Sequence, residues 1–82
     1  MPLPKDILNE LKWRSDRDLS KAEIWYVHRG APNDTRIISG HDIVDLEHSY
    51  MVLSENRLLS RIPFHRIFRI VYEGKVIFAR KK

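Results

Sequence analysis

The sequence predicts an α+β domain: a small, mainly antiparallel sheet with an N-terminal helix, a second short helix and a C-terminal β-hairpin. Three observations support this prediction. Apolar residues near the N-terminus repeat with the period of an α-helix. Short segments rich in β-branched and aromatic residues follow, separated by turn-forming residues. The last of these segments is interrupted at Glu73-Gly74, as a hairpin would be.

The chain has 82 residues, which is enough for a single domain over residues 1–82. Hydrophobic residues make up 43% and charged residues 32%, a balance that favours a folded chain over a disordered one. Cysteine is absent, which excludes disulfides, cysteine-based zinc sites and thiol nucleophiles. The sequence has no apolar signal-peptide segment and no apolar run long enough to span a membrane. We therefore expect a cytoplasmic protein with no membrane partner.

The first element is expected to be an amphipathic helix over Pro4–Trp13. Ile7, Leu8 and Leu11 fall on one face at the helical period. A proline is well suited to the first turn of a helix, where its missing N–H has no partner to lose. Residues 15–21 show no period and are expected to form a loop.

A central strand is expected over residues 23–29, because this segment is rich in β-forming residues. Alternation along a strand places its side chains on two opposite faces. One face carries Ile24, Tyr26 and His28, and the other carries Trp25, Val27 and Arg29. Residues 30–34 then form a turn, and Thr35–Ser39 forms a second strand.

The second short helix is expected over His41–Leu46, capped by Ser39 or Gly40. Tyr50–Leu53 is expected to be a third strand, and Ser54–Ser60 a polar loop.

The C-terminal hairpin is expected over His65–Arg80. Because Glu-Gly is a poor pair for a two-residue type I′ turn, we expect a three-residue loop with Gly74 in the left-handed conformation. This register sets Ile70 opposite Val76. In either register the open end gathers four basic groups, namely His65, Arg66, Arg80 and Lys81.

Two His-Arg pairs are the most informative chemical feature of the chain. His28-Arg29 runs directly into a Gly-Ala-Pro turn, and His65-Arg66 follows Pro63 at the start of a strand. Arginine offers a planar fork of donors that matches phosphate oxygens, and histidine can also donate. The net charge of +4 favours a polyanionic partner, although it serves solubility equally well. Both pairs together suggest one anion-binding pocket.

Several side chains near the pairs have two interpretations. Asp34 and Arg36 either orient the first pair or belong to an ordinary solvated turn. The C-terminal aromatic residues interleave with basic ones, which is typical of single-stranded nucleic acid binding but also fits a hydrophobic core. They are Phe64, Phe68, Tyr72 and Phe78.

Metal and cofactor sites are not predicted. The four histidines form no metal-binding motif, and His41 with Asp42 and Asp45 would make only a weak site. Two histidines on different strands are compatible with a phosphodiesterase in which His28 and His65 act as acid and base. Neither is followed by the hydroxyl residue of the two-histidine phosphoesterases. The pattern therefore favours phosphate binding over catalysis and leaves enzymatic activity open.

Four segments in order resemble a known family across nearly the whole chain. They are Leu11-Lys12-Trp13, the stretch from Tyr26 to Arg36, Ser39-Gly40-x-Asp42-Ile43, and Ile62-Pro63-x-His65-Arg66-Ile67. The chain resembles a small, mostly archaeal family described as the RNA cyclic group end recognition domain. This resemblance implies recognition of RNA ends bearing a 2′,3′-cyclic phosphate, beside RNA repair or processing modules. The implied binding residues are His28, Arg29, His65 and Arg66, supported by Asp34 and Arg36.

The sequence thus predicts an RNA-binding domain for terminal phosphates, with single-stranded RNA ends and an RNA-processing protein as partners. A ring near the pocket, Tyr26 or Phe64, would stack on the terminal base. Two alternatives remain at this point: the small phosphodiesterase, and a protein-interaction module in which the histidines are structural.

Overall fold

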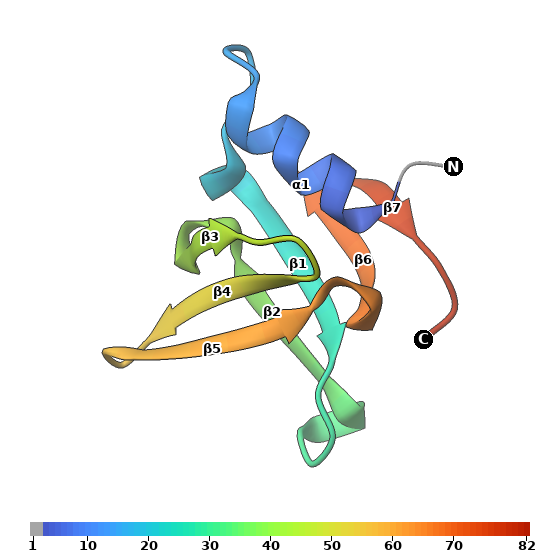
Figure 1. Ribbon diagram of the computed structural model, residues 1–82. Helices are drawn as coiled ribbons and strands as arrows, with labels where there is room; N and C mark the ends of the chain where they lie inside the picture. The colour runs from blue at the N-terminus through green and yellow to red at the C-terminus, as the bar shows by residue number, and fades with distance from the viewer. Residues whose placement is uncertain (1–2) are drawn as a thin grey trace.

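The computed structural model describes residues 3–82, which form one α-helix and seven strands in two antiparallel sheets (Figure 1). The four-stranded sheet has the order β2-β1-β6-β7, with β1 at Ala22–Val27, β2 at Thr35–Ser39, β6 at Ile67–Tyr72 and β7 at Lys75–Ala79. The three-stranded sheet consists of β3 at Ile43–Leu46, β4 at Tyr50–Glu55 and β5 at Leu58–Pro63. Four short 3₁₀ turns connect these elements: η1 at Leu19–Lys21, η2 at Pro32–Asp34, η3 at Gly40–Asp42 and η4 at Phe64–Arg66.

The predicted N-terminal helix is present as α1, Pro4–Trp13, with proline in its first turn. Its apolar stripe, Ile7, Leu8 and Leu11, is buried, whereas Trp13 at its end is 75% exposed. Packing of this stripe, rather than the intrinsic stability of a ten-residue helix, holds α1 in place. Among the described residues, no helix is long and apolar enough to cross a membrane.

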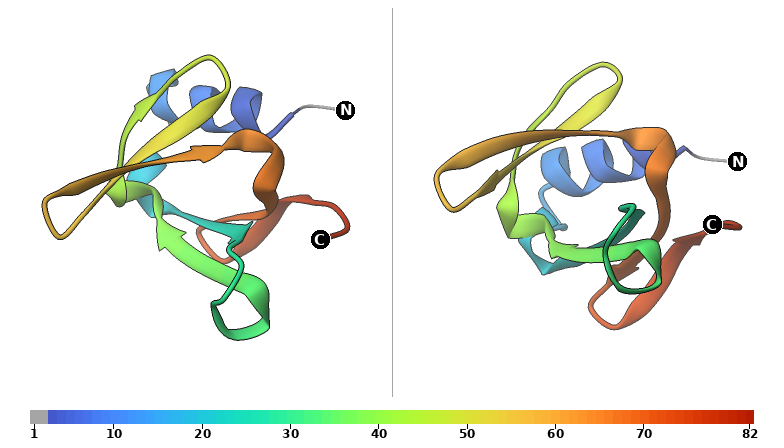
Figure 2. Two further views of the ribbon diagram at one scale, coloured as in Figure 1. Left: turned by 60° about the horizontal axis from the view of Figure 1, so that its bottom comes forward. Right: turned by 90° about the horizontal axis from the view of Figure 1, so that it is seen from below.

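The core lies between the two sheets and α1, as the view from below shows (Figure 2). Its fully buried members come from all three: Leu8 of α1, Ile24, Tyr26, Ile67 and Ile70 of the four-stranded sheet, and Met51 and Leu53 of β4. Burying side chains of this size contributes about 1.5–3 kcal/mol each. The inner face of the four-stranded sheet is therefore apolar, and its other face points away from the core.

The expected second helix is wrong. The Ser39 hydroxyl does accept a hydrogen bond from the His41 N–H at 3.1 Å, but the capped turn is only η3. The chain then continues as strand β3, which pairs with β4. A Cβ on Gly40 would lie 1.9 Å from the carbonyl oxygen of Leu19, so the backbone of η3 is pressed against η1 at this point. Tertiary pairing has overridden the local helix signal.

The expected polar loop at Ser54–Ser60 is also wrong, because these residues form the tip of the β4–β5 hairpin. Its two turn residues, Asn56 and Arg57, both have positive φ (49° and 70°), as a type I′ turn requires. The hairpin projects from the body of the molecule (Figure 1), and Leu58 and Leu59 are 71% and 63% exposed. Because neither face of the hairpin is buried at its tip, apolar and polar residues do not alternate there. The sequence therefore gives no pattern by which this part of β4 and β5 could be predicted.

The C-terminal hairpin β6–β7 is present, but its predicted register is wrong. Glu73 and Gly74 form a two-residue turn with positive φ at both positions (49° and 83°), and Tyr72 pairs with Lys75. Ile70 then lies opposite Phe78, because a bulge shifts the register between Ile70 and Val71. The bulge lets both Ile77 and Phe78 pack against the core.

Candidate nucleic-acid interface

The antiparallel pairing of β1 with β6 brings the two His-Arg segments together. Tyr26 near the end of β1 pairs with Ile67 at the start of β6. His28-Arg29 leaves β1 at this edge, and the η4 turn that carries His65-Arg66 enters β6 there. Two segments separated by more than thirty positions in the sequence therefore meet at one end of the sheet.

A hollow of about 390 Å³ lies at this meeting point and is lined by Val27, Arg29, His65 and Arg66. We call it the arginine hollow. Of the residues that the structure describes, no acidic side chain lines it. Over residues 3–82, the side chains of Arg29, His65 and Arg66 make neither a hydrogen bond nor an ion pair, so their N–H donors are available to a ligand. Such a surface suits an anion with several oxygen acceptors.

His28 does not line the arginine hollow. Its imidazole packs edge-on against the ring of Tyr26, with the centroids 6.2 Å apart. The two rings lie on the inner side of β1 because alternate residues of a strand share a face. The structure thus brings together three of the four residues of the two pairs.

Asp34 lies in the turn that follows Arg29 and holds the backbone of this turn in place. Its carboxylate accepts a hydrogen bond from the Gly30 N–H at 3.2 Å, and its carbonyl accepts one from the His28 N–H at 2.8 Å. Gly30 has φ +94°, a conformation that side chains disfavour. Asp34 is therefore placed to position the loop of the first pair.

Arg36 is turned away from the arginine hollow. Its guanidinium forms a bidentate ion pair with Glu55 of β4, with one contact at 3.1 Å. The hydrogen bonds to Glu55 raise the pKa of the Arg36 guanidinium. These two residues border a separate polar hollow beside the tip of the β4–β5 hairpin. Arg36 therefore ties the two sheets together.

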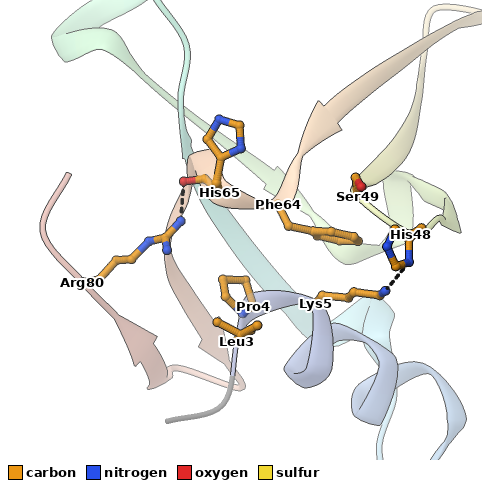
Figure 3. Close-up of a pocket in the computed structure, with 8 residues that line it drawn as sticks. All are labelled: Leu3, Pro4, Lys5, His48, Ser49, Phe64, His65 and Arg80. Atoms are coloured by element: carbon orange, nitrogen blue, oxygen red, sulfur yellow. Dashed lines mark hydrogen bonds between the residues drawn. The ribbon is translucent and has the colours of Figure 1, made fainter.

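A second hollow of about 270 Å³ adjoins the arginine hollow and shares His65 with it (Figure 3). Leu3, Pro4 and Phe64 form its apolar part, and its cationic groups are already engaged. They are Lys5, which lies 3.4 Å from the His48 imidazole, and Arg80, which donates to the backbone carbonyls of Ile67 and His65. The predicted gathering of Arg80 near His65 is thus observed, but Arg80 holds the η4 backbone. Free cationic donors are found in the arginine hollow.

The prediction that Tyr26 or Phe64 stacks on the terminal base is wrong. Tyr26 is fully buried and Phe64 is 7% exposed, so neither presents a face to a base. Burial also raises the pKa of the Tyr26 phenol. Trp25, which precedes Tyr26 and shares the face of Val27 and Arg29, is half-buried on the outer side of the sheet. The alternation along β1 was the signal that pointed to it.

A family model described as the MJ1316 RNA cyclic group end recognition domain matches residues 1–80. The chain belongs to this family. The resemblance expected from the two His-Arg segments and their neighbours is thus confirmed.

Archaeal relatives share the length of the chain. A UPF0248 protein of Methanococcus maripaludis is 37% identical over 79 residues, which cover 94% of this chain and 97% of the relative. The UPF0248 protein MJ1316 of Methanocaldococcus jannaschii is 32% identical over 79 residues, covering 94% and 92%. A UPF0248 protein of Pyrobaculum islandicum is 32% identical over 78 residues, covering 94% and 88%. No solved structure matches the chain significantly.

Proposed function

We propose that this protein is an RNA-binding domain that holds the terminal phosphate of an RNA end, a 2′,3′-cyclic phosphate above all, in the arginine hollow. One observation carries the proposal. Arg29, His65 and Arg66 come from two distant segments and line one hollow. Among residues 3–82, no acidic side chain lines this hollow, and the three side chains have no hydrogen-bond or ion-pair partner. The description of the family supports the choice of ligand.

The chemistry of the hollow suits recognition of such an end. The guanidinium groups of Arg29 and Arg66 can each donate two parallel hydrogen bonds to the non-bridging oxygens of a phosphate. His65 can donate to a third oxygen or to a ribose oxygen. Val27 supplies an apolar wall beside them. We place this recognition in RNA processing or repair, with a protein of that process as the second partner.

The two-histidine phosphodiesterase is less well supported. General acid–base cleavage requires both imidazoles within reach of one phosphate. His65 lines the arginine hollow, whereas His28 packs on Tyr26 on the inner side of β1. We therefore assign binding rather than turnover to the hollow.

The test is a comparison of one short RNA with three different 3′ ends. We would measure its affinity when it ends in a 2′,3′-cyclic phosphate, a 3′-phosphate or a 3′-hydroxyl, and inspect each RNA for cleavage afterwards. The expected result is preference for the cyclic end, no cleavage, and loss of that preference in Arg66→Ala. Arg61→Ala is the matched control, because Arg61 is an exposed arginine on β5 in the other sheet.

Two results would contradict the proposal. Equal and salt-sensitive binding of all three ends would reduce the hollow to a generic basic surface and favour the protein-interaction module. Cleavage of the cyclic end that is lost in His28→Ala would favour the phosphodiesterase.

A further inference from the structure

The outer face of the four-stranded sheet carries a stripe of aromatic and cationic side chains that the arginine hollow does not use. Ile37 of β2 and Val76 of β7 lie toward its edges and are 49% and 54% exposed. Trp25 of β1 and Arg69 of β6 lie between them as a register pair. The C-terminal Lys82 reaches over the part near Phe68, where its amine donates a hydrogen bond to the Asn33 carbonyl.

Trp25 and Arg69 form a stacked pair. The Arg69 guanidinium lies 4.6 Å from the centroid of the indole, and the indole N–H donates to the Glu23 carboxylate at 2.8 Å. The pairing of β1 with β6 also shifts register between Trp25 and Tyr26, which leaves Phe68 without a partner residue in β1. The Phe68 ring supports the pair and meets the Trp25 ring edge-on at 6.4 Å. Phe68 is 8% exposed and is not a member of the main core cluster. Lys82 adds a cation 5.6 Å from the Phe68 ring.

This stripe is continuous with the arginine hollow. Trp25 and Val27 share a face of β1, and Val27 lines the hollow. On β6, Phe68 and Arg69 follow Arg66 of the hollow after two and three residues. Two residues of a strand span about 6.6 Å, a distance that a nucleotide can bridge. A chain whose terminal phosphate occupies the hollow would therefore meet Trp25 and Arg69 next.

We propose that the single-stranded RNA adjoining the bound end crosses this outer face, with one base stacked on the Trp25–Arg69 pair. Aromatic rings and arginine planes are the surfaces on which unpaired bases stack, and the cations Arg69 and Lys82 complement the RNA backbone. The inference rests on the proposed function, since the hollow fixes where the RNA ends. It adds a second subsite, selective for single strands and indifferent to the chemistry of the end.

The experiment compares a small ligand with a longer one that has the same end. Adenosine 2′,3′-cyclic phosphate fills only the hollow, whereas a hexanucleotide with the same cyclic end also reaches the outer face. We would replace Trp25 by leucine, which keeps an apolar cover on Phe68 but removes the ring. Trp25→Leu should weaken hexanucleotide binding about tenfold and leave binding of the mononucleotide within a factor of two.

Two controls accompany this variant. Trp13→Ala removes the other tryptophan of the chain, which is exposed on α1, and should change neither affinity. In a Trp13→Phe background Trp25 is the sole tryptophan, and the hexanucleotide should quench its fluorescence while the mononucleotide does not. For the cation, Arg69→Ala is compared with Arg17→Ala, because Arg17 covers the Tyr72 ring in the same manner but away from this face.

The outcomes separate the two proposals. If Trp25→Leu leaves hexanucleotide binding unchanged, the hexanucleotide does not quench Trp25 fluorescence and Arg29→Ala still weakens binding, the stacking subsite is overturned and the end-recognition proposal stands. If Trp25→Leu weakens binding while Arg29→Ala and Arg66→Ala do not, the outer face binds RNA and the end-recognition proposal fails. If the protein binds neither ligand, both proposals are overturned, and a protein becomes the expected partner of the outer face.

Discussion

The two His-Arg pairs are alike in sequence but are presented differently by the backbone. His28-Arg29 continues the alternation of β1, so the imidazole lies inward against Tyr26 and the guanidinium lies outward in the arginine hollow. His65-Arg66 lies in the η4 turn, and both of its side chains line the hollow. Successive residues of a strand differ by half a turn, whereas those of a 3₁₀ turn differ by about a third of a turn. The same dipeptide therefore offers one ligand group in the first case and two in the second.

The supports of the two pairs differ as well. Asp34 holds the loop of the first pair through the Gly30 N–H. Arg80 holds the second pair through hydrogen bonds to the carbonyls of His65 and Ile67. One support is a carboxylate within the same loop and the other is a guanidinium from the end of the partner strand. The second pair thus depends on the β6–β7 hairpin for its position.

The largest effect is expected from removing the guanidinium groups. Arg29→Ala and Arg66→Ala should each cost about 2 kcal/mol of binding free energy for a cyclic-phosphate RNA, because each removes charge-assisted hydrogen bonds. The double variant should lose less than the sum, since both arginines act on one phosphate. Isothermal titration of the four proteins measures this. Full additivity would indicate that the two pairs bind separate groups.

A smaller effect is expected from the histidines, and it should be unequal. His65→Ala should lower the affinity for the cyclic end about fivefold, because it removes one donor from the hollow. His28→Ala should leave the affinity unchanged and lower the thermal stability, because its ring packs on Tyr26. Equal losses of affinity would contradict the division of the first pair by the strand.

Replacing either support, Arg80 or Asp34, should weaken RNA binding by a similar factor. Lysine lacks the guanidinium fork with which Arg80 reaches two carbonyls from two separate nitrogens, so Arg80→Lys should loosen η4 and weaken binding about threefold. Asp34→Ala should weaken binding by a similar factor through the loop of the first pair. Amide hydrogen exchange locates each effect: faster exchange is expected around η4 in the first variant and around residues 28–34 in the second. Changes at both places in either variant would indicate that the two segments move as one unit.

The smallest effect on binding is expected at Arg36, which the sequence had grouped with the first pair. Arg36→Ala breaks a half-exposed ion pair with Glu55 and should lower the stability by about 1 kcal/mol. The affinity for RNA should stay unchanged, because the guanidinium does not line the arginine hollow. Urea unfolding and a binding titration on the same variant separate the two effects.

Much of the local structure could be predicted from residue patterns. The bounds of α1, Pro4–Trp13, follow from its proline start and its apolar period, and β2 follows from its β-forming run. The alternation of β1 separated Tyr26 from Trp25 correctly. The local patterns of the sequence could not show that β3 takes the place of the expected second helix. The close approach of Gly40 to Leu19 is a contact between segments that are distant in the sequence.

The sequence by itself determined which groups are candidates for binding a phosphate: two His-Arg pairs, each at the end of a strand. Only the tertiary structure decided which of those groups share a hollow. The antiparallel pairing of β1 with β6 joins the two segments, and the 3₁₀ geometry of η4 turns both of its side chains to the same side. The same pairing buries Tyr26 and leaves Trp25 outside, because each face of a strand takes its environment from what packs on it. The chemistry of a side chain is set by its own residue, but its neighbours in space depend on contacts between residues far apart in the sequence.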